Sequence, residues 1–470
     1  MPQGTVMTSP THTERAGPAT LTQALAGRLT APVDAETRQR ARRHVIDWLG
    51  CAAAGMASPA GRVLHAHASG REPGAVYALG AGRRGLEAAA MLNGGLGNVL
   101  EMDDIHRTSI LHPGPVVIPA ALAVAEREGA AVGALLDGVV RGYEAMIRIG
   151  AALGPGHYAF FHNTATAGPF GAAAAAASLL KLTPERTVWA LGNAGTTTGG
   201  LWQMRLDPGV ISKQVHTGRA AAWGVQSADL ARLGGAGPVA ILDGPLGLFA
   251  ATCPDAAADT VVAEPDAAWK IWDVSFKPWA ACRHAHPTID AALAMRDRID
   301  PRHLDHVEVR TYRDAVTFCD NPTPSTPIEA KFSLQHCVAA VLFYGRPPLE
   351  AFEPPAIHDG RIAALRATVT VAEDPALTQA YPQHYGASVT MTLADGQKVA
   401  ATMTDALGDP DNPLSEADTL AKARELMTWA GLDRRAADRA IAAIETLDDA
   451  VPVSALIDAL PQPEDFSEQR

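Results

Sequence analysis

A long run of helix-forming sequence constrains the fold of this chain more than any other feature. From about residue 20 to residue 266 the chain is rich in Ala, Leu and Gly, and helical signals follow one another with few runs of β-branched residues. Residues 172–182 are so rich in alanine that they must form a closely packed helix, because small side chains let neighbouring helices approach. Asp34 can cap a helix that continues through Leu49. The sequence therefore predicts a large all-helical domain over residues 20–266.

The pattern changes after Pro265, where alternating apolar and polar residues replace the helical period. This alternation predicts four strands, the last two joined at Asp395-Gly396 into a β-hairpin. The strands are expected at 306–312, 367–372, 388–393 and 397–403, with helices at about 287–298 and 328–344 between them. We therefore expect a mainly α fold, in which a smaller α+β domain over residues 267–404 follows the helical one.

Two flanking segments complete the predicted organisation. From Ser415 the helical pattern returns, and we expect residues 405–460 to form C-terminal helices that pack back on the first domain. Residues 1–19 mix Pro, Gly, Thr and Ser without an apolar signal segment, so we expect a disordered tail. No later stretch reaches the roughly 18 apolar residues that a membrane-spanning helix needs. The sequence thus predicts no membrane partner.

Charge and cysteine content narrow the class of protein. The chain has 51 acidic and 39 basic residues, a net charge of -12, which argues against a nucleic-acid partner and is typical of a soluble cytoplasmic protein. Positive charge must then be concentrated wherever an acidic substrate binds. The five cysteines are widely spaced and form no Cys-x-x-Cys pair, so the sequence predicts neither a disulfide framework nor a zinc or iron–sulfur site.

Residues 75–85 are similar to a dinucleotide-binding fingerprint. A short extended segment is followed by Gly80, Gly82 and Gly85, and Asp103 stands about 20 residues farther on. In a Rossmann fold that acidic residue ends a second strand, whereas residues 86–102 contain no β-branched run. A glycine-rich turn before a helix explains the same residues. An NAD-dependent oxidoreductase is the more distant alternative.

Two carboxylates, a cation and an imidazole gather in one glycine- and proline-rich turn. Asp103 and Asp104 come first, Arg107 and Thr108 follow, and His112 comes just before a new apolar helix. Such a turn can present the imidazole beside a helix N-terminus, where backbone N–H groups and the helix dipole favour a bound anion. The same spacing also fits aspartates that cap helices and a histidine packed in the core.

A second histidine and a lysine are further candidates. His162 follows an aromatic pair and precedes small residues, so its ring can be partly buried, which lowers a histidine pKa and keeps the ring neutral, as a general base requires. A packed core histidine also fits. Lys213 lies where a loop turns into a small-residue helix, and an ammonium group there can hold a substrate carboxylate. Only seven of the 39 basic residues are lysine, so a retained lysine is a candidate for chemistry.

The segment that opens the second domain brings two cations, two imidazoles and a thiol together in sequence. They are Lys277, Cys282, Arg283, His284 and His286. The thiol and the imidazoles could in principle bind a metal ion. Three such ligands so close on one strand or turn rarely fold around one ion, so we expect no metal.

These clusters, in this order, resemble the MmgE/PrpD family over about residues 20–460. The likeness rests on residues 41–50, 93–114, 161–162, 212–213, 277–286 and 408–413. The family includes 2-methylcitrate dehydratase, cis-aconitate decarboxylase and iminodisuccinate epimerase. The resemblance implies an all-helical domain with a smaller α+β lid, a homodimer, and an active site in the cleft between the two domains.

The resemblance also implies which side chains line that cleft. The matching positions are Asp103, Thr108, His112, His162, Lys213 and Lys277, with Arg283 and His286 as further substrate-binding candidates. Arg107, from the same turn as His112, is a substrate-binding candidate by its place in the sequence. Cys282 stands where the decarboxylase branch has a histidine. The turn at His112 contains Leu-His-Pro-Gly in place of the Glu-Trp-Gly-His-Pro-Ser-Asp of typical 2-methylcitrate dehydratases. These two departures leave the substrate open.

The chemistry that these groups suit begins with proton removal next to a carboxylate. Lysines and arginine neutralise the carboxylates of the substrate, and a neutral histidine can then remove the adjacent proton. We expect His112 or His162 to be the base, with the other, helped by Asp103, as the acid. The favoured function is a dehydratase-like lyase without cofactor, acting on a small di- or tricarboxylic acid such as 2-methylcitrate or citrate. The alternatives are an epimerase of an imino- or amino-dicarboxylate, a decarboxylase of the cis-aconitate type, and a helical scaffold without catalysis.

Overall fold

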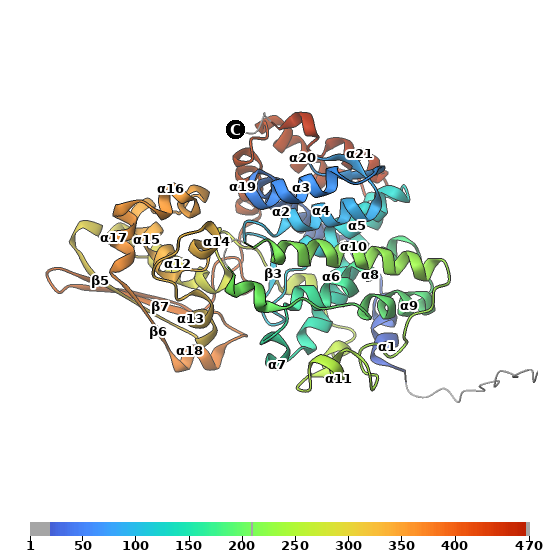
Figure 1. Cartoon of the computed structure of the whole chain (residues 1–470), viewed down its shortest axis with the longest axis horizontal. Coiled ribbons are helices and arrows are strands. Elements are labelled where there is room, and N and C mark those ends of the chain that lie inside the picture. The colour runs from blue at the N-terminus through green and yellow to red at the C-terminus, as the bar shows by residue number, and fades with distance from the viewer. Residues whose placement is uncertain (1–18, 208–209, 467–470) are drawn as a thin grey trace, which may run out of the picture.

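A bundle of long helices forms the larger of two lobes in the computed structural model of the chain, which describes residues 19–207 and 210–466 (Figure 1). The smaller lobe carries the main β-sheet. The helices of the larger lobe are α1 (Leu21–Arg28), α2 (Ala35–Ala57), α3 (Pro59–Ser69), α4 (Leu86–Gly97), α5 (Gly114–Arg127), α6 (Val132–Ala152), α7 (Pro155–Tyr158), α8 (Asn163–Leu179), α9 (Pro184–Gly195), α10 (Ser212–Arg232) and α11 (Leu248–Thr252). The predicted mainly α fold is confirmed.

Close approach between helices explains the small residues of this lobe. Helix α8, which contains the alanine run, is buried along almost its whole length and packs against α5, α6 and α10. A Cβ atom on Gly218 of α10 would lie 2.3 Å from the carbonyl oxygen of Met91 in α4. A Cβ atom on Gly224 would lie 2.6 Å from the carbonyl oxygen of Pro169 in α8. Because both distances are far below van der Waals contact, glycine at these positions lets three helix backbones touch.

The helix that begins after Asp34 is longer than the stretch that the sequence marks clearly. The Asp34 carboxylate accepts a hydrogen bond from the backbone N–H of Thr37 at 2.8 Å, and α2 then continues past Leu49 to Ala57. The next residue, Ser58, accepts a hydrogen bond from the N–H of Gly61 and so caps α3. One serine therefore separates two consecutive helices.

The smaller lobe is built on a four-stranded sheet in the order β6-β5-β7-β8. Strand β5 (Leu304–Thr311) pairs in parallel with β6 (Val369–Glu373) and antiparallel with β7 (Ala387–Leu393), which forms a hairpin with β8 (Lys398–Met403). Helices α12 (His286–Leu293) and α15 (Leu334–Tyr344) pack on this sheet. The remaining helices are α13 (Arg313–Cys319), α14 (Pro327–Lys331), α16 (Pro354–Ile357), α17 (Gly360–Ala367) and α18 (Pro375–Ala380). All four predicted strands are present.

The two helices predicted in this lobe are shorter than expected. Helix α12 ends at Leu293, and a separate 3-10 turn covers 296–298. The stretch 328–344 is divided into α14 and α15, because the Ser333 hydroxyl accepts a hydrogen bond from the N–H of His336 and starts a new helix. A serine within an apolar run thus acts as a cap where the sequence pattern predicts continuity.

The last three helices lie against the larger lobe. They are α19 (Glu416–Trp429), α20 (Arg434–Thr446) and α21 (Val453–Ala459) (Figure 1). Helix α19 packs on α2 so closely that a Cβ atom on Gly50 would lie 2.8 Å from the Cα atom of Ala423. The tail expected over residues 1–19 lies outside the described residues except for Ala19.

The glycine-rich segment after residue 75 is a β-hairpin. Strands β1 (Pro73–Ala78) and β2 (Gly82–Arg84) pair only with each other and are antiparallel. Gly80 and Gly82 have φ values of 70° and 72°, which the tight turn requires and other residues rarely adopt. A Rossmann fingerprint needs a parallel β-α-β unit. The dinucleotide interpretation of this segment is therefore wrong, and the glycine-rich turn before α4 is correct.

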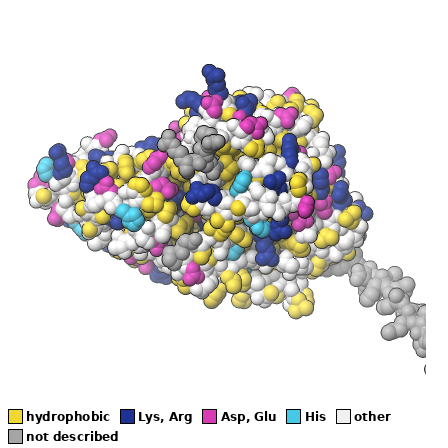
Figure 2. All heavy atoms as spheres, turned by 45° about the horizontal axis from the view of Figure 1, so that its top comes forward, with side chains coloured by type: hydrophobic (Ala, Val, Ile, Leu, Met, Phe, Trp, Pro, Cys, Tyr) yellow, Lys and Arg dark blue, Asp and Glu magenta, His cyan; other side chains and the backbone are white. Residues whose placement is uncertain are grey.

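The surface carries both signs of charge. On the face shown in Figure 2, lysine and arginine side chains alternate with aspartate and glutamate side chains and form no continuous basic stripe. None of the described helices is long and apolar enough to cross a membrane.

Replacing Gly218 by alanine tests the close packing of α4 and α10. The added methyl group would collide with a backbone oxygen that cannot move freely, so we expect a loss of about 1–3 kcal/mol of stability. The matched control is Gly27→Ala in α1, where nothing lies within 4 Å of the new atom. Differential scanning calorimetry should show a lower Tm for the first variant and an unchanged or slightly higher Tm for the second. Equal Tm values would contradict the packing argument.

Candidate active site

A cavity of about 370 Å³ opens between the two lobes, and side chains from both line it. Seven of the residues selected from the sequence are among them: His112, His162, Lys213, Lys277, Cys282, Arg283 and His284. The first three come from the helical lobe and the last four from the start of the smaller lobe. Segments that are far apart in the chain therefore meet at one cavity.

Three long helices of the larger lobe begin at this cavity. His112 stands two residues before α5, His162 is the N-cap residue of α8, and Lys213 is the second residue of α10. The backbone N–H of His112 donates to the Thr164 hydroxyl of α8 at 3.1 Å, which ties two of these helix starts together. Because the N-terminal end of a helix carries partial positive charge, the cavity favours an anion even before its side chains are considered.

The turn after α4 forms the floor of the cavity. Glu101 has a φ of 58°, a left-handed backbone conformation that costs a non-glycine residue about 1 kcal/mol or more. Lys277 donates to the Glu101 carbonyl oxygen at 2.9 Å, and Lys422 of α19 donates to the Met102 carbonyl oxygen at 2.6 Å. Lys422 also pairs with the buried carboxylate of Asp47 at 2.6 Å. Two lysines from opposite sides therefore hold consecutive carbonyl groups of this turn.

The Glu101 carboxylate lies between two ammonium groups. It forms an ion pair with Lys213, and its other oxygen is 3.6 Å from Lys277 Nζ. Burial alone would raise the pKa of Glu101, but the charges of Lys213 and Lys277 outweigh burial and lower it. In turn, burial would lower the pKa of Lys213, and Glu101 raises it. The ion pair therefore favours the charged forms of both Glu101 and Lys213.

Asp103 orients the ring of His112. Its Oδ2 atom lies 2.9 Å from His112 Nδ1, and the Asp104 carbonyl oxygen lies 3.1 Å from the same nitrogen. Two acceptors at Nδ1 require the proton there, so Nε2 is left as the nitrogen that can accept a proton. Burial would raise the pKa of Asp103, but His112 and Lys277 outweigh burial and hold that pKa below its ordinary value. The pair has the arrangement of a base and its orienting carboxylate.

Asp104 holds this turn through hydrogen bonds and does not line the cavity. Its Oδ1 accepts a hydrogen bond from the N–H of Gly114 at 2.8 Å, and its Oδ2 accepts one from the Tyr143 hydroxyl at 2.6 Å. The same Oδ2 lies 2.7 Å from His44 Nδ1. Burial raises the pKa of Asp104 to about 6. Asp104 is therefore a structural partner of the first turn of α5, which fits the capping interpretation.

His162 is a buried, neutral imidazole. Its ring packs 4.6 Å from the Trp202 ring, and its Nδ1 lies 3.3 Å from His216 Nδ1. Burial lowers the pKa of His162 well below its ordinary value, and the nearby positive charge of Lys213 lowers it further. The ring centroids of His112 and His162 are 6.5 Å apart, so a small molecule can reach both.

The side chains of the cluster at residues 277–286 contact different partners and do not meet around one point. Arg283 forms a buried ion pair with Asp409, and its Nη1 lies 3.2 Å from His286 Nδ1. His284 Nδ1 is instead 2.6 Å from the Tyr312 hydroxyl. Burial would raise the pKa of the Cys282 thiol, but a hydrogen bond with Cys319 outweighs it and lowers that pKa. His286 lies behind the wall of the cavity, bound to the Ala281 carbonyl oxygen at 3.1 Å.

Arg107 and Thr108 are not among the residues that line the cavity, so the structure does not support direct substrate contact for either in this state. Thr108 is exposed on the surface. Arg107 reaches the loop after β8, where it lies 2.9 Å from Asp405 Oδ1 and forms an ion pair with Asp411. Arg107 was selected by its closeness in sequence to His112 and Thr108 by its match to the family pattern, but neither side chain lines the cavity.

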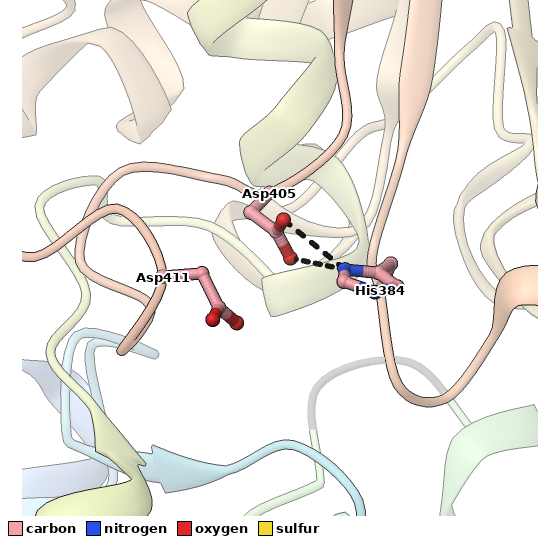
Figure 3. Close-up of side chains that lie close together, drawn as sticks. All are labelled: His384, Asp405 and Asp411. Carbon is pink, nitrogen blue, oxygen red and sulfur yellow. Dashed lines mark hydrogen bonds and ion pairs between the residues drawn. The ribbon is translucent and has the colours of Figure 1, made fainter.

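Asp405 and Asp411 also belong to the one group of potential metal ligands found among residues 19–207 and 210–466. His384 completes it, with its Nδ1 2.9 Å from Asp405 Oδ1, and all three side chains face one another in Figure 3. The Arg107 guanidinium forms ion pairs with both carboxylates. The group is therefore an ion-pair cluster that joins the two lobes.

Glu101 is the main site residue that sequence analysis missed. It stands two residues before Asp103, one of three acids within four residues, and no spacing rule says which of them faces a cavity. The left-handed backbone at Glu101 turns its side chain toward Lys213, whereas Asp103 lies behind His112. Lys422 was also missed, because its role depends on a long-range contact between α19 and this turn.

Two domain models of one protein family match most of the chain. Residues 20–260 match the MmgE/PrpD N-terminal domain, and residues 279–449 match the MmgE/PrpD C-terminal domain. The cis-aconitate decarboxylase-like protein oryM of Aspergillus oryzae is 27% identical over 458 residues, which cover 90% of this chain and 93% of the relative. Human cis-aconitate decarboxylase is 27% identical over 57% of each chain. The 2-methylcitrate dehydratase of Cupriavidus necator is 31% identical over 24% of this chain and 25% of its own.

Replacing Lys422 by methionine tests the support of the floor turn. Asp47 would stay buried without its partner, which costs about 3–5 kcal/mol, and the Met102 carbonyl would lose its donor. We expect a clearly lower Tm by calorimetry, whereas Lys398→Met, at an exposed position, should leave Tm unchanged. Adding Asp47→Leu to the first variant should restore part of the loss. A Tm for Lys422→Met equal to that of the control would refute the role of Lys422.

The lowered pKa of His162 predicts a pH-dependent stability. Below about pH 6.5 the unfolded chain takes up a proton at this residue, and the folded chain does not, so the free energy of unfolding falls as pH falls. The substitution His162→Gln removes this contribution to the pH dependence of the free energy of unfolding. The drop in Tm between about pH 7.5 and pH 5 should therefore be smaller in the variant than in the parent protein. Parallel curves for the two proteins would mean that His162 is not held neutral.

Proposed function

The chain belongs to the MmgE/PrpD family, and from that premise we propose that it is a lyase that acts on a small organic acid at the carbon next to a carboxylate. Two kinds of group support the proposal. Imidazoles that can move a proton and ammonium groups that can hold a carboxylate share one cavity. Amino-acid side chains suffice for each step of this chemistry.

The pairing of Asp103 with His112 carries the proposal. A carboxylate that holds the Nδ1 proton of a histidine leaves Nε2 free to accept a proton and stabilises the imidazolium that results. We therefore assign His112 as the base. His162 is the second imidazole of the cavity, and because its ring is neutral it can donate or accept a hydrogen bond without bringing a further positive charge.

The reaction requires the substrate carboxylate to lie beside Lys213 and Lys277. Their charges stabilise the electron-rich carboxylate that forms when His112 removes the neighbouring proton. In a dehydration, the electron pair of the broken C–H bond becomes the new C=C bond. The hydroxyl group on the next carbon then leaves with its own bonding pair and takes up a proton as water. The imidazolium that forms at His112 holds the proton that this hydroxyl group takes up, and the neutral His162 ring can donate a hydrogen bond to the departing oxygen.

Decarboxylation is the second candidate, and the relatives that align over most of the chain favour it. The proteins named cis-aconitate decarboxylase or cis-aconitate decarboxylase-like align over 57–90% of this chain, whereas those named 2-methylcitrate dehydratase align over about a quarter. In this reaction the electron pair of the C–C bond stays on carbon as CO2 departs. The carbon then gains a proton that His112 takes from solvent and passes on, and CO2 is the leaving group.

One screen separates these reactions. Methylcitrate, citrate, cis-aconitate and iminodisuccinate are each incubated with the protein in heavy water and followed by proton NMR. A new alkene signal from a hydroxy acid indicates dehydration, and loss of CO2 with one deuterium gained indicates decarboxylation. Exchange of a C–H proton without a new product indicates the epimerase alternative. The absence of all three changes, across these acids and the substituted acids tested below, would refute the proposal.

Two substitutions test the assignment of the base. We expect His112→Gln to lower kcat by about 10²–10⁴-fold and Asp103→Asn to lower kcat by a smaller factor, with little change in KM for either. His303→Gln is the control, because that side chain is 71% exposed on the smaller lobe. Steady-state kinetics on the best substrate of the screen give the measurement. If kcat stays unchanged in His112→Gln, the base is a different group.

A further inference from the structure

Above its charged floor the cavity has an aromatic wall to which both lobes contribute. Tyr158 and Trp202 come from the helical lobe, with ring centroids 5.7 Å apart, and Phe318 comes from the smaller lobe. The Phe318 ring is stacked on Tyr158 at 5.8 Å and meets the Trp202 ring edge-on at 6.3 Å. All three side chains line the cavity and are only half-buried. Apolar surface is therefore open to whatever enters.

Further apolar side chains line the same cavity. Met204 and Leu206 come from the 3-10 helix Trp202–Leu206, and Ile328 and Phe332 come from the smaller lobe. Leu206 is 74% exposed, although it lines the cavity. A ligand whose apolar part lay along this wall would remove that surface from water, which is favourable in proportion to the area covered.

The charged floor has little capacity for additional carboxylates. Lys213, Lys277 and Arg283 are the only lysines and arginines among the lining residues that the structure describes. Lys213 and Lys277 share Glu101, and Arg283 is paired with Asp409. A tricarboxylate would bring three negative charges to a floor where Glu101 already pairs with both lysines and Asp409 already pairs with Arg283. A ligand with fewer carboxylates and more hydrocarbon matches the cavity better.

We propose that the substrate is an organic acid with one or two carboxylates at one end and a hydrocarbon arm, alkyl or aryl, that lies along the Trp202, Leu206 and Phe318 wall. This inference rests on the proposed function for its reaction, and it narrows the substrate class. The volume of about 370 Å³ is within the range of sites that enclose drug-sized ligands. The arm would run from the floor, past the aromatic rings, to the mouth at Leu206.

Binding to a graded series of ligands tests the arm without any need for turnover. The probes are 2-methyl-, 2-butyl-, 2-hexyl- and 2-phenylsuccinate, with citrate and cis-aconitate as arm-free acids, each titrated into the full chain by isothermal calorimetry. Because each buried methylene contributes about 0.8 kcal/mol, we expect Kd to fall about fourfold per added methylene. Phenylsuccinate should bind more tightly than methylsuccinate. A Kd that stays flat or rises with arm length, with citrate binding most tightly, would overturn the inference.

A pair of leucine variants locates the arm. Leu206→Asn places a polar group on the wall, and Leu233→Asn makes the same change at a residue that is 79% exposed and does not line the cavity. We expect the first variant to weaken hexylsuccinate binding about tenfold and to leave methylsuccinate binding nearly unchanged. The second should change neither. Equal effects of the two substitutions would mean that the arm does not lie along this wall.

The same ligands separate this inference from the proposed function. The unsaturated and hydroxylated forms of the substituted acids are tested for turnover by NMR alongside cis-aconitate and citrate. If the arm-free acids are turned over and Kd does not change across the substituted succinates, the lyase proposal stands and the proposed hydrocarbon arm is refuted. If Kd falls with arm length and no acid is turned over, the proposed hydrocarbon arm is supported and the proposed lyase activity is refuted. Only turnover that improves with arm length supports both.

Discussion

The buried acids of the turn after α4 are the constraint on which the rest of the site depends. Glu101, Asp103 and Asp104 lie within four residues and are almost completely buried. Burying a carboxylate without a partner costs several kcal/mol, so each must be matched by a cation or by hydrogen-bond donors. The partners come from everywhere else in the chain: Lys213 from α10, Lys277 from the smaller lobe, His112 from the start of α5, and Tyr143 from α6. Lys422 of α19 also donates a hydrogen bond to the backbone of this turn. Folding of both lobes and of the C-terminal helices therefore completes the same small region.

This arrangement explains what a single sequence could and could not predict. The helical lobe and the four strands were predictable because their signals are local: an alanine run, an N-cap at Asp34, and alternation over 306–312. The MmgE/PrpD resemblance is confirmed by matches to both domains, since it rests on the order of many short motifs. The break at Ser333 was not predictable, because the serine lies in an apolar run that also fits a continuous helix.

Within the site, sequence analysis identified residues at helix starts and missed those placed by backbone geometry. His112, His162 and Lys213 each stand where a loop meets a helix, which is a visible pattern. The choice between Glu101 and Asp103 depends on one left-handed residue, and nothing local marks a glutamate for that conformation. Arg107 shows the opposite case, because a cation close in sequence to a catalytic candidate proved to be a contact between the lobes.

The pairing of the cavity cations has a consequence for how the site must bind an acid. Glu101 pairs with Lys213 and shares Lys277, so a substrate carboxylate does not meet free ammonium groups. It must share them with Glu101 or displace it, and a second negative charge beside Glu101 raises the pKa of that carboxyl group. Binding is therefore an exchange of one carboxylate for another, with a small net electrostatic gain. When the charged end of a ligand gains little, its affinity must come from the remainder of the molecule, and the aromatic wall of Tyr158, Trp202 and Phe318 is the part of the cavity that can supply it.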